Sequence, residues 1–185
     1  TYSGDAVILA NGSRASSVAG SCESGYEIAK SLGHHLIEPL SALTALKCKG
    51  NSFSGWSGVR TEGKITLYID GTPEVSQQGE LQLTDYGVSG IPVFQISRYA
   101  IRAVHENKSA ELSINFFPEL NRKELEEYLE HRKAACPYKT EKELLIGLFP
   151  EKLIRVLCAQ KDLIRGITDF RLPVKNGLSF EQAQV

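Results

Sequence analysis

Ser89 is the residue whose surroundings come nearest to those of an enzyme nucleophile. An alternating apolar segment at 79–83 precedes it, and an apolar pattern with helical spacing follows from Pro92. Hydrolases of the α/β class place their serine at such a strand–turn–helix corner, with a glycine two residues away on either side. Gly87 fills the first of these positions, but Ile91 fills the second. A small serine hydrolase using Ser89 is therefore the third of the three functions that we consider.

The turn around Ser89 also suits a ligand-binding role without covalent chemistry. Gly87 and Gly90 flank the serine, so backbone N–H groups can face outward at the N-terminus of the next helix, where a carboxylate, phosphate or polarised carbonyl is stabilised. Thr84, Tyr86 and Ser89 would then present hydroxyl groups to a ligand or to another domain. Turn geometry alone explains the same residues, and the sequence leaves both interpretations open.

Histidines and cysteines are too scattered in this sequence to form a metal site. His34 and His35 are adjacent and would point to opposite faces of a strand, which indicates one buried and one solvated ring. His105 and His131 fall late in predicted helices, where a positive charge suits the helix dipole. No pair of cysteines has the Cys-x-x-Cys spacing, which favours reduced thiols over a zinc site. The four cysteines are Cys22, Cys48, Cys136 and Cys158.

The composition is that of an ordinary globular domain. The chain has 185 residues, of which 42% are hydrophobic and 23% are charged, and its formal net charge is -1. Basic residues are scattered, so no surface for nucleic acid is expected. No apolar run approaches the roughly 20 residues of a membrane span, and we expect a cytoplasmic protein with no membrane contact. Methionine is absent even at position 1, so we expect a chain that was processed or cut from a longer protein.

The N-terminal part predicts half of a dinucleotide-binding unit. The apolar run 5–10 is typical of a buried strand that enters a turn at Asn11, Gly12 and Ser13. A helix is predicted over 21–32. The Gly-x-Gly-x-x-Gly fingerprint is missing, so we do not expect this chain to carry a pyrophosphate loop of its own.

The middle of the chain predicts a small β-barrel or strongly curved sheet with a single helix. Short segments alternate between apolar and polar residues, most clearly at 65–69, and turns are predicted at 61–64 and 70–73. The loop 51–58 contains Trp56, the one tryptophan, and either covers a substrate or folds back on the barrel.

Three short helices are predicted after Pro118. Capping boxes mark the first two, Asn121 with Glu124 and Thr140 with Glu143, and the third covers 152–159. Extended chain is predicted from 167 to 174. The expected class is α+β, with a β-barrel subdomain and a short helical-bundle subdomain. The expected divisions are 1–35, a junction; 36–117, the barrel; 118–165, the helices; and 166–185, a return strand.

Four segments together resemble one family, the BaiN-like NAD(P)/FAD-dependent oxidoreductases, which include proteins of the aminoacetone oxidase family. Residues 7–13 and 20–34 resemble its Ala-Thr-Gly-Gly segment and Gly-Ser-x-x-x-Gly-Tyr helix. Residues 79–98 resemble its Gly-Glu-Leu-Leu-Phe-Thr-x-Tyr-Gly-x-Ser-Gly-Pro segment, and 180–185 its Phe-x-x-Ala-x-Val. The sequence departs from the family pattern at Asn11, Ser13, Gln82, Leu83 and Ile91.

The resemblance implies that this chain is the inserted barrel and helical region of a two-part FAD-binding flavoprotein. FAD would be bound in the full-length protein, with NAD(P)H as reductant, and the chain alone would be inactive. Its partners would be the FAD-binding domain of the same protein and a small-molecule substrate. Residues facing substrate or flavin would be Thr84, Tyr86, Gly87, Ser89 and Gly90. Residues at the junction with the flavin domain would be Asn11, Gly12, Ser13, Gly20 and Ser21. No catalytic residue and no metal ligand is assigned.

A non-catalytic binding module is the competing function. In that case the small-residue loop at 13–21 and the loop around Trp56 would hold a protein or ligand partner. A large exposed apolar patch, together with the lack of a neighbouring flavin domain in the gene, would favour this function.

Overall fold

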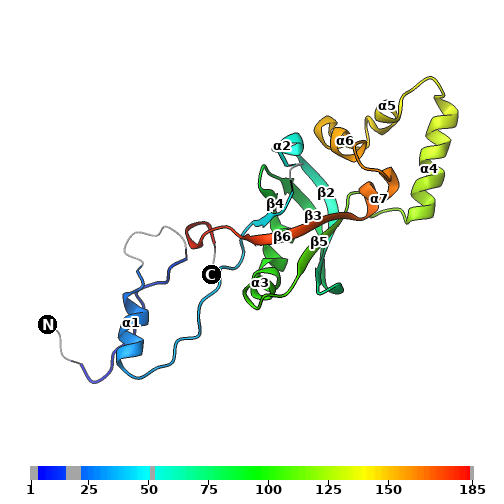
Figure 1. Cartoon of the computed structure of the whole chain (residues 1–185). Helices are drawn as coiled ribbons and strands as arrows, with labels where there is room; N and C mark the ends of the chain where they lie inside the picture. The colour runs from blue at the N-terminus through cyan, green and yellow to red at the C-terminus, as the bar shows by residue number, and fades with distance from the viewer. Residues whose placement is uncertain (1–3, 16–21, 51–52, 184–185) are drawn as a thin grey trace.

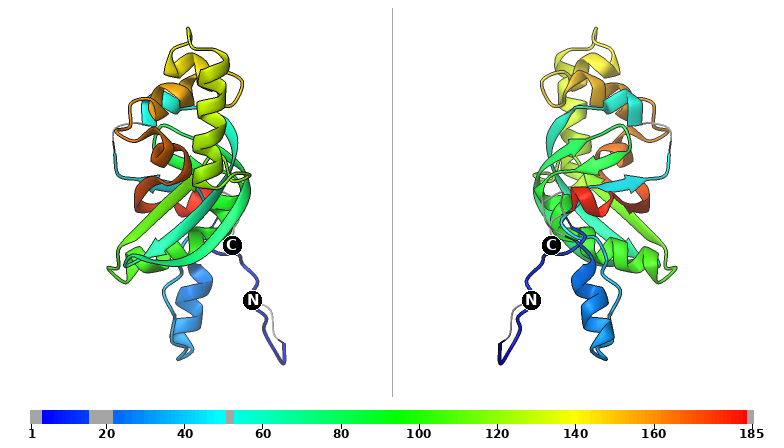
Figure 2. Two further views of the ribbon diagram at one scale, coloured as in Figure 1. Left: turned by 90° about the vertical axis from the view of Figure 1, so that its right-hand side faces the viewer. Right: turned by 90° about the vertical axis from the view of Figure 1, so that its left-hand side faces the viewer.

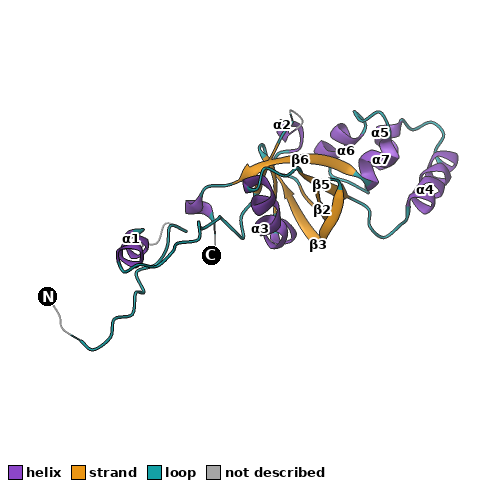
Figure 3. Cartoon of the chain, turned by 60° about the horizontal axis from the view of Figure 1, so that its bottom comes forward, coloured by secondary structure: helices purple, strands orange, loops and turns teal. Residues whose placement is uncertain are grey.

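The computed structural model describes residues 4–15, 22–50 and 53–183. A closed β-barrel occupies its centre, with one helix at the side of the barrel nearest the chain termini and a group of helices at the opposite side (Figures 1 and 3). The α+β class expected from the sequence, with a small barrel and a helical part, is confirmed.

Six strands form the barrel, and all neighbouring strands are antiparallel. Their order is β1-β4-β3-β2-β5-β6, and β1 pairs with both β4 and β6, which closes the sheet. The strands are β1 (Leu46–Cys48), β2 (Arg60–Ile69), β3 (Thr72–Leu83), β4 (Gly87–Ser89), β5 (Ala110–Asn115) and β6 (Phe170–Gly177).

The long hairpin of β2 and β3 turns at Asp70 and Gly71. Their φ angles of 49° and 81° lie in the left-handed region that a two-residue hairpin turn requires, so the turn predicted at 70–73 is confirmed. The turn predicted at 61–64 is wrong, because these residues pair with β3 inside the hairpin. Gly63, which suggested that turn, instead allows close packing: an added Cβ would lie 3.0 Å from the backbone oxygen of Asn115.

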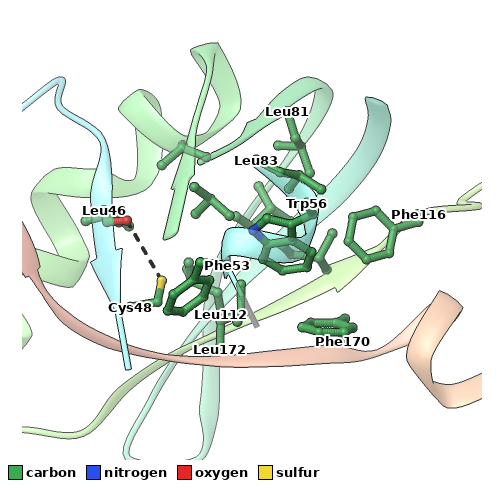
Figure 4. Packing of buried hydrophobic residues seen from close by; sticks show 14 of the residues in the cluster. Leu46, Cys48, Phe53, Trp56, Leu81, Leu83, Leu112, Phe116, Phe170 and Leu172 are labelled. Atoms are coloured by element: carbon green, nitrogen blue, oxygen red, sulfur yellow. Dashed lines mark hydrogen bonds between the residues drawn. The ribbon is translucent and has the colours of Figure 1, made fainter. Parts of the chain in front are cut away.

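Alternate side chains of the long strands fill the barrel. Ile65 and Leu67 of β2 lie opposite Ile114 and Leu112 of β5, and none of the four has exposed surface. This is the alternation predicted for 65–69. Figure 4 shows the cluster that these strands surround.

The helix α3 (Ile91–His105) closes one end of the barrel. It contacts β2, β3, β4, β5 and β6 through one apolar face. That face consists of Pro92, Val93, Ile96, Ser97, Ala100, Ile101 and Ala103. The helical spacing predicted five of these residues, and it also predicted Val104, which is half-buried. Pro92 lies in the first turn, where its missing N–H removes no helical hydrogen bond.

Four helices lie toward the other end of the barrel: α4 (Arg122–Ala135), α5 (Glu141–Leu145), α6 (Glu151–Leu157) and α7 (Leu163–Thr168). Both predicted capping boxes are present, Asn121 with Glu124 and Thr140 with Glu143. None of the described helices is long and apolar enough to cross a membrane.

Helix α7 was not predicted from the sequence. It overlaps the extended chain predicted at 167–174 only at Ile167 and Thr168, and β6 confirms that prediction from Phe170 onward. The carboxylate of Asp162 accepts a hydrogen bond from the backbone N–H of Arg165 at 2.9 Å and caps the helix. The backbone N–H of Phe116 donates to the carbonyl of Ile167 at 2.8 Å. Local periodicity misses α7 because this second contact joins residues that are distant in sequence.

The segment at 5–10 is not the buried strand that the sequence predicted. Val7 and Ile8 are 83% and 90% exposed, and no strand of the described ranges pairs with them. An apolar run becomes a strand only where another strand supplies its hydrogen bonds. This segment and α1 (Ser24–Ser31) stand away from the barrel (Figures 1 and 2).

The connection from α1 to the barrel is irregular. His34 and His35 lie in it and are both exposed, so the interpretation of one buried ring is wrong. The chain enters and leaves the barrel side by side, because the backbone N–H of Leu178 donates to the carbonyl of Ala45 at 3.1 Å. A short 3₁₀ helix, η1 (Phe180–Gln182), follows this point.

Candidate functional site

The predicted strand–turn–helix corner exists, with an extra short strand in it. β3 ends at Leu83, a turn follows, and β4 leads through Gly90 directly into α3. The backbone N–H of Thr84 donates to the carbonyl of Gly87 at 3.1 Å and closes the turn. The three residues of β4 are buried, so most of the corner faces the barrel and not solvent.

Gly87 and Gly90 are required by backbone packing. Their φ angles of 150° and 108° are unfavourable for other residues. An added Cβ on Gly87 would lie 2.3 Å from the carbonyl oxygen of Leu46, and one on Gly90 would lie 2.6 Å from that of Glu80. Both glycines therefore bring strands, and the start of α3, into close contact. This role is structural and leaves the expected ligand contact of either glycine untested.

Thr84 lies under the short helix α2 (Phe53–Trp56). The indole N–H of Trp56 donates to the carbonyl of Thr84 at 3.1 Å, and Trp56 has no exposed surface. Its ring centroid is 5.1 Å from that of Phe170 (Figure 4). The Thr84 hydroxyl is buried and has no hydrogen-bond partner within the described part of the chain. The side chain of Trp56 thus folds back on the barrel, so it is not available to a partner as the binding-module alternative requires.

Tyr86 and Ser89 have different degrees of exposure. Tyr86 is half-buried, and its carbonyl accepts a hydrogen bond from the backbone N–H of Cys48 at 2.9 Å. Ser89 is 9% exposed. No histidine or carboxylate of the described segments hydrogen-bonds its hydroxyl. The base that a serine nucleophile needs is missing from this geometry, which argues against the hydrolase alternative.

Ser89 lines a groove of about 570 Å³ between β3 and the beginning of α3. We call this hollow the β3–α3 groove. Its lining consists of Arg60, Gln77, Gln78, Gly79, Glu80, Gln82, Ser89, Gly90, Ile91, Pro92, Phe94 and Gln95. Sequence reasoning identified Ser89 and Gly90 but missed the glutamines, which become neighbours of the serine only through the pairing of β3 with β4.

The junction candidates lie beside α1. The side-chain amide of Asn11 donates to the carbonyl of Cys22 at 3.1 Å, and an added Cβ on Gly25 would lie 2.2 Å from the Asn11 amide oxygen. Gly12 is exposed and has a φ of 83°. The hydroxyl of Ser13 accepts a hydrogen bond from the backbone N–H of Ala15 at 3.1 Å. The other two candidates, Gly20 and Ser21, lie outside the described residues.

Arg14 connects this N-terminal segment to the C-terminal one. Its guanidinium lies 5.8 Å from the ring centroid of Tyr26 in α1 and 5.3 Å from that of Phe180 in η1. The two segments that were expected to join a flavin domain therefore lie together. The backbone of Gly12 is exposed beside them.

The cysteines are free thiols with contrasting environments. Hydrogen bonding with the Ser24 hydroxyl, at 2.9 Å, lowers the pKa of the exposed Cys22 thiol. Burial raises the pKa of Cys48 to about 12. Across the described ranges, no group of three or more His, Cys, Asp and Glu side chains could hold a metal ion.

Comparisons with known proteins relate this architecture to one family. Residues 41–185 match the model of the HI0933-like protein barrel and H2TH domain. The chain is 37% identical to the 3-dehydro-bile acid delta(4,6)-reductase of Clostridium scindens, over 100% of this chain and 49% of that protein. It is 27% identical to the ribosomal RNA dihydrouridine synthase of Haemophilus influenzae, over 94% of this chain and 41% of that protein. The chain thus spans less than half the length of either relative.

The barrel, the helices beyond it and the family match agree with one another, and they confirm the family resemblance drawn from the sequence motifs. This chain belongs to the HI0933-like flavoprotein family and comprises its barrel and H2TH domain.

Proposed function

We propose that this chain is the insert domain of a flavin-dependent oxidoreductase and lies on the substrate side of a flavin that a separate FAD-binding domain holds. One observation carries the proposal: the N-terminal segment, which lies beside the C-terminal one, exposes several apolar side chains. Val7, Ile8, Leu32 and Ile37 are 83%, 90%, 69% and 83% exposed. Exposed apolar groups concentrated on connecting segments are typical of a surface that another domain covers.

The reaction would be a two-electron reduction. Bound FAD would supply hydride transfer, with NAD(P)H as the source of electrons. The residues of this chain would orient the substrate and exclude water. Of the five substrate-facing candidates, Gly87, Gly90 and Thr84 have structural roles at this corner, which leaves Tyr86 and Ser89 as the side chains proposed to contact substrate.

A small molecule is the proposed class of substrate. The more similar relative is by name a reductase of a bile acid derivative, and the less similar one is by name an enzyme of ribosomal RNA. A protein that binds RNA needs clustered Lys and Arg side chains to neutralise the phosphates. Here the formal net charge is -1, and the Lys and Arg residues of α4 alternate with glutamates in the pairs Arg122–Glu126 and Lys123–Glu127.

The visible spectrum of the longer natural protein, purified beside this 185-residue chain, tests the proposal. We expect the longer protein to be yellow and to bleach when NADPH or NADH is added without oxygen. The chain alone should stay colourless, because the described residues provide no cradle for FAD. A longer protein that is colourless and takes up no added FAD would overturn the proposed function.

A further inference from the structure

The β3–α3 groove has the size and lining of a small-molecule site. Its volume of about 570 Å³ is within the range of roughly 300–1,000 Å³ usual for such sites. One wall is apolar and is formed by Ile91, Pro92 and Phe94 at the start of α3. The polar lining is dominated by uncharged amides, which belong to Gln77, Gln78, Gln82 and Gln95.

Ser89 brings an unpaired hydroxyl to this groove. The residue is nine-tenths buried, yet its side chain has no hydrogen-bond partner within the described part of the chain. Because Ser89 lines the groove, its hydroxyl is available to a ligand there as donor or acceptor. A ligand in the groove that accepts a hydrogen bond would give the Ser89 hydroxyl a partner.

The N-terminus of α3 adds a second, independent source of hydrogen-bond donors. Pro92 has no N–H, and the N–H of Phe94 donates to the carbonyl of Gly90 at 3.0 Å. The N–H groups of Ile91 and Val93 therefore have no intrahelical acceptor. With 15 residues, α3 also directs the positive end of its dipole toward this turn. Both features favour an oxygen atom that carries partial negative charge.

The charges of the groove lining indicate whether a charged or a neutral oxygen atom would bind here. Among the described residues that line the groove, Arg60 is the one cation, and its guanidinium pairs with the carboxylate of Glu80 at 2.6 Å. A carboxylate or phosphate would find no free positive charge here and would lie near Glu80. A neutral carbonyl needs only the donors that are present.

We propose that the β3–α3 groove binds a small apolar ketone. The hydroxyl of Ser89 donates to the ketone oxygen, the N-terminus of α3 lies beside that oxygen, and the apolar body packs on Ile91, Pro92 and Phe94. The assignment of this ketone as the substrate rests on the proposed function, whereas its binding to the groove does not require the flavin.

Titration of the ¹⁵N-labelled 185-residue chain with androst-4-en-3-one, followed by NMR, tests the site. We expect saturable shifts of the backbone amides of Ser89, Gly90, Ile91 and Val93. Ser89→Ala should weaken binding roughly 3- to 10-fold, the effect of one lost hydrogen bond, and Ser89→Thr should restore it. Ser76→Ala is the matched control, because Ser76 also lies on the barrel but its hydroxyl bonds to Thr66 at 2.8 Å.

Two further ligands test whether the ketone oxygen is the group that Ser89 binds. Androst-4-ene, which lacks the ketone, should bind without dependence on Ser89, and 5β-cholanic acid, which has a carboxylate and no ketone, should bind more weakly than the ketone. Unshifted amides at 89–93, or ketone binding that Ser89→Ala leaves unchanged, would overturn the site. Cholanic acid binding that equals the ketone's and depends on Ser89 would overturn the ketone assignment. A longer protein without flavin would overturn the proposed function and leave the groove intact.

Discussion

The indole N–H of Trp56 lies 3.1 Å from the backbone carbonyl oxygen of Thr84 and donates a hydrogen bond to it. Trp56 is fully buried and Thr84 nearly so. This contact fixes α2 to the turn between β3 and β4, and the same turn leads to Ser89. Helix α2 therefore braces the candidate site through the buried side chain of Trp56.

Trp56→Phe should lower the free energy of unfolding by about 1–3 kcal/mol. The substitution keeps an aromatic ring but leaves the buried carbonyl of Thr84 without a donor and opens space in the core. Urea denaturation of the chain measures the change. Tyr138→Phe is the control, because Tyr138 is 79% exposed, and it should change the unfolding free energy by less than about 0.5 kcal/mol. Equal stability of Trp56→Phe and the wild type would contradict the bracing role.

Gly90→Ala should destabilise the chain by about 2 kcal/mol or more. The new Cβ would lie 2.6 Å from the carbonyl oxygen of Glu80, and the φ of 108° would be strained. Gly71→Asn provides the control, since Gly71 has a φ of 81° but no atom within 4 Å of an added Cβ and Asn tolerates such a φ. Thermal unfolding of the two variants separates the two effects, because Gly90→Ala has both the close contact and the strained φ, whereas Gly71→Asn has only the positive φ. A near-neutral Gly90→Ala would disprove the close approach of β3 and α3.

The buried thiol of Cys48 should make stability fall at high pH. Its pKa is raised from 9.0 to about 12 in the folded protein, so between these values the unfolded state has lost a proton that the folded state keeps. The stabilisation is complete below about pH 9 and declines as the pH rises to about 12. Urea denaturation across this range measures the slope. Cys48→Ala should flatten it relative to the wild type, and Cys136→Ala should not; parallel slopes for all three proteins would contradict the burial of Cys48.

Asn121→Ala should cost about 1 kcal/mol of stability. It removes the capping box of α4, in which the Asn121 side chain accepts from the N–H of Glu124 at 3.1 Å and Glu124 bonds back at 2.8 Å. Lys123→Ala, in the same first turn, removes only an exposed pair with Glu127 and should cost less than about 0.5 kcal/mol. Circular dichroism during urea denaturation distinguishes the two variants, and equal losses would argue against the cap.

The parts of the fold that could be predicted are those that local chemistry determines. Spacing of apolar residues placed α3, and side-chain caps placed the starts of α4 and α5. The errors arose where a distant contact decides the structure. Gly63 suggested a turn, but the close approach of β5 keeps it inside β2.

The candidate site follows the same division. Ser89 and Gly90 were identified from the strand–turn–helix pattern, whereas the buried position of Trp56 was one of two open alternatives. The glutamines of the β3–α3 groove carry no local signal, because only the pairing of β3 with β4 brings them beside the serine. The prediction of a bound flavin came from the family resemblance and not from the periodicity of the sequence.

The half-reactions of the longer flavin-containing protein, measured by rapid mixing for the wild type, Ser89→Ala and Ser76→Ala, test the substrate-side role of this domain most directly. Ser89→Ala should keep its FAD and be reduced by NADPH or NADH at the wild-type rate, whereas its reoxidation by the ketone substrate should slow roughly 3- to 10-fold. Ser76→Ala should match the wild type in both steps. Loss of FAD from Ser89→Ala, or reoxidation at the wild-type rate, would contradict a substrate contact at Ser89.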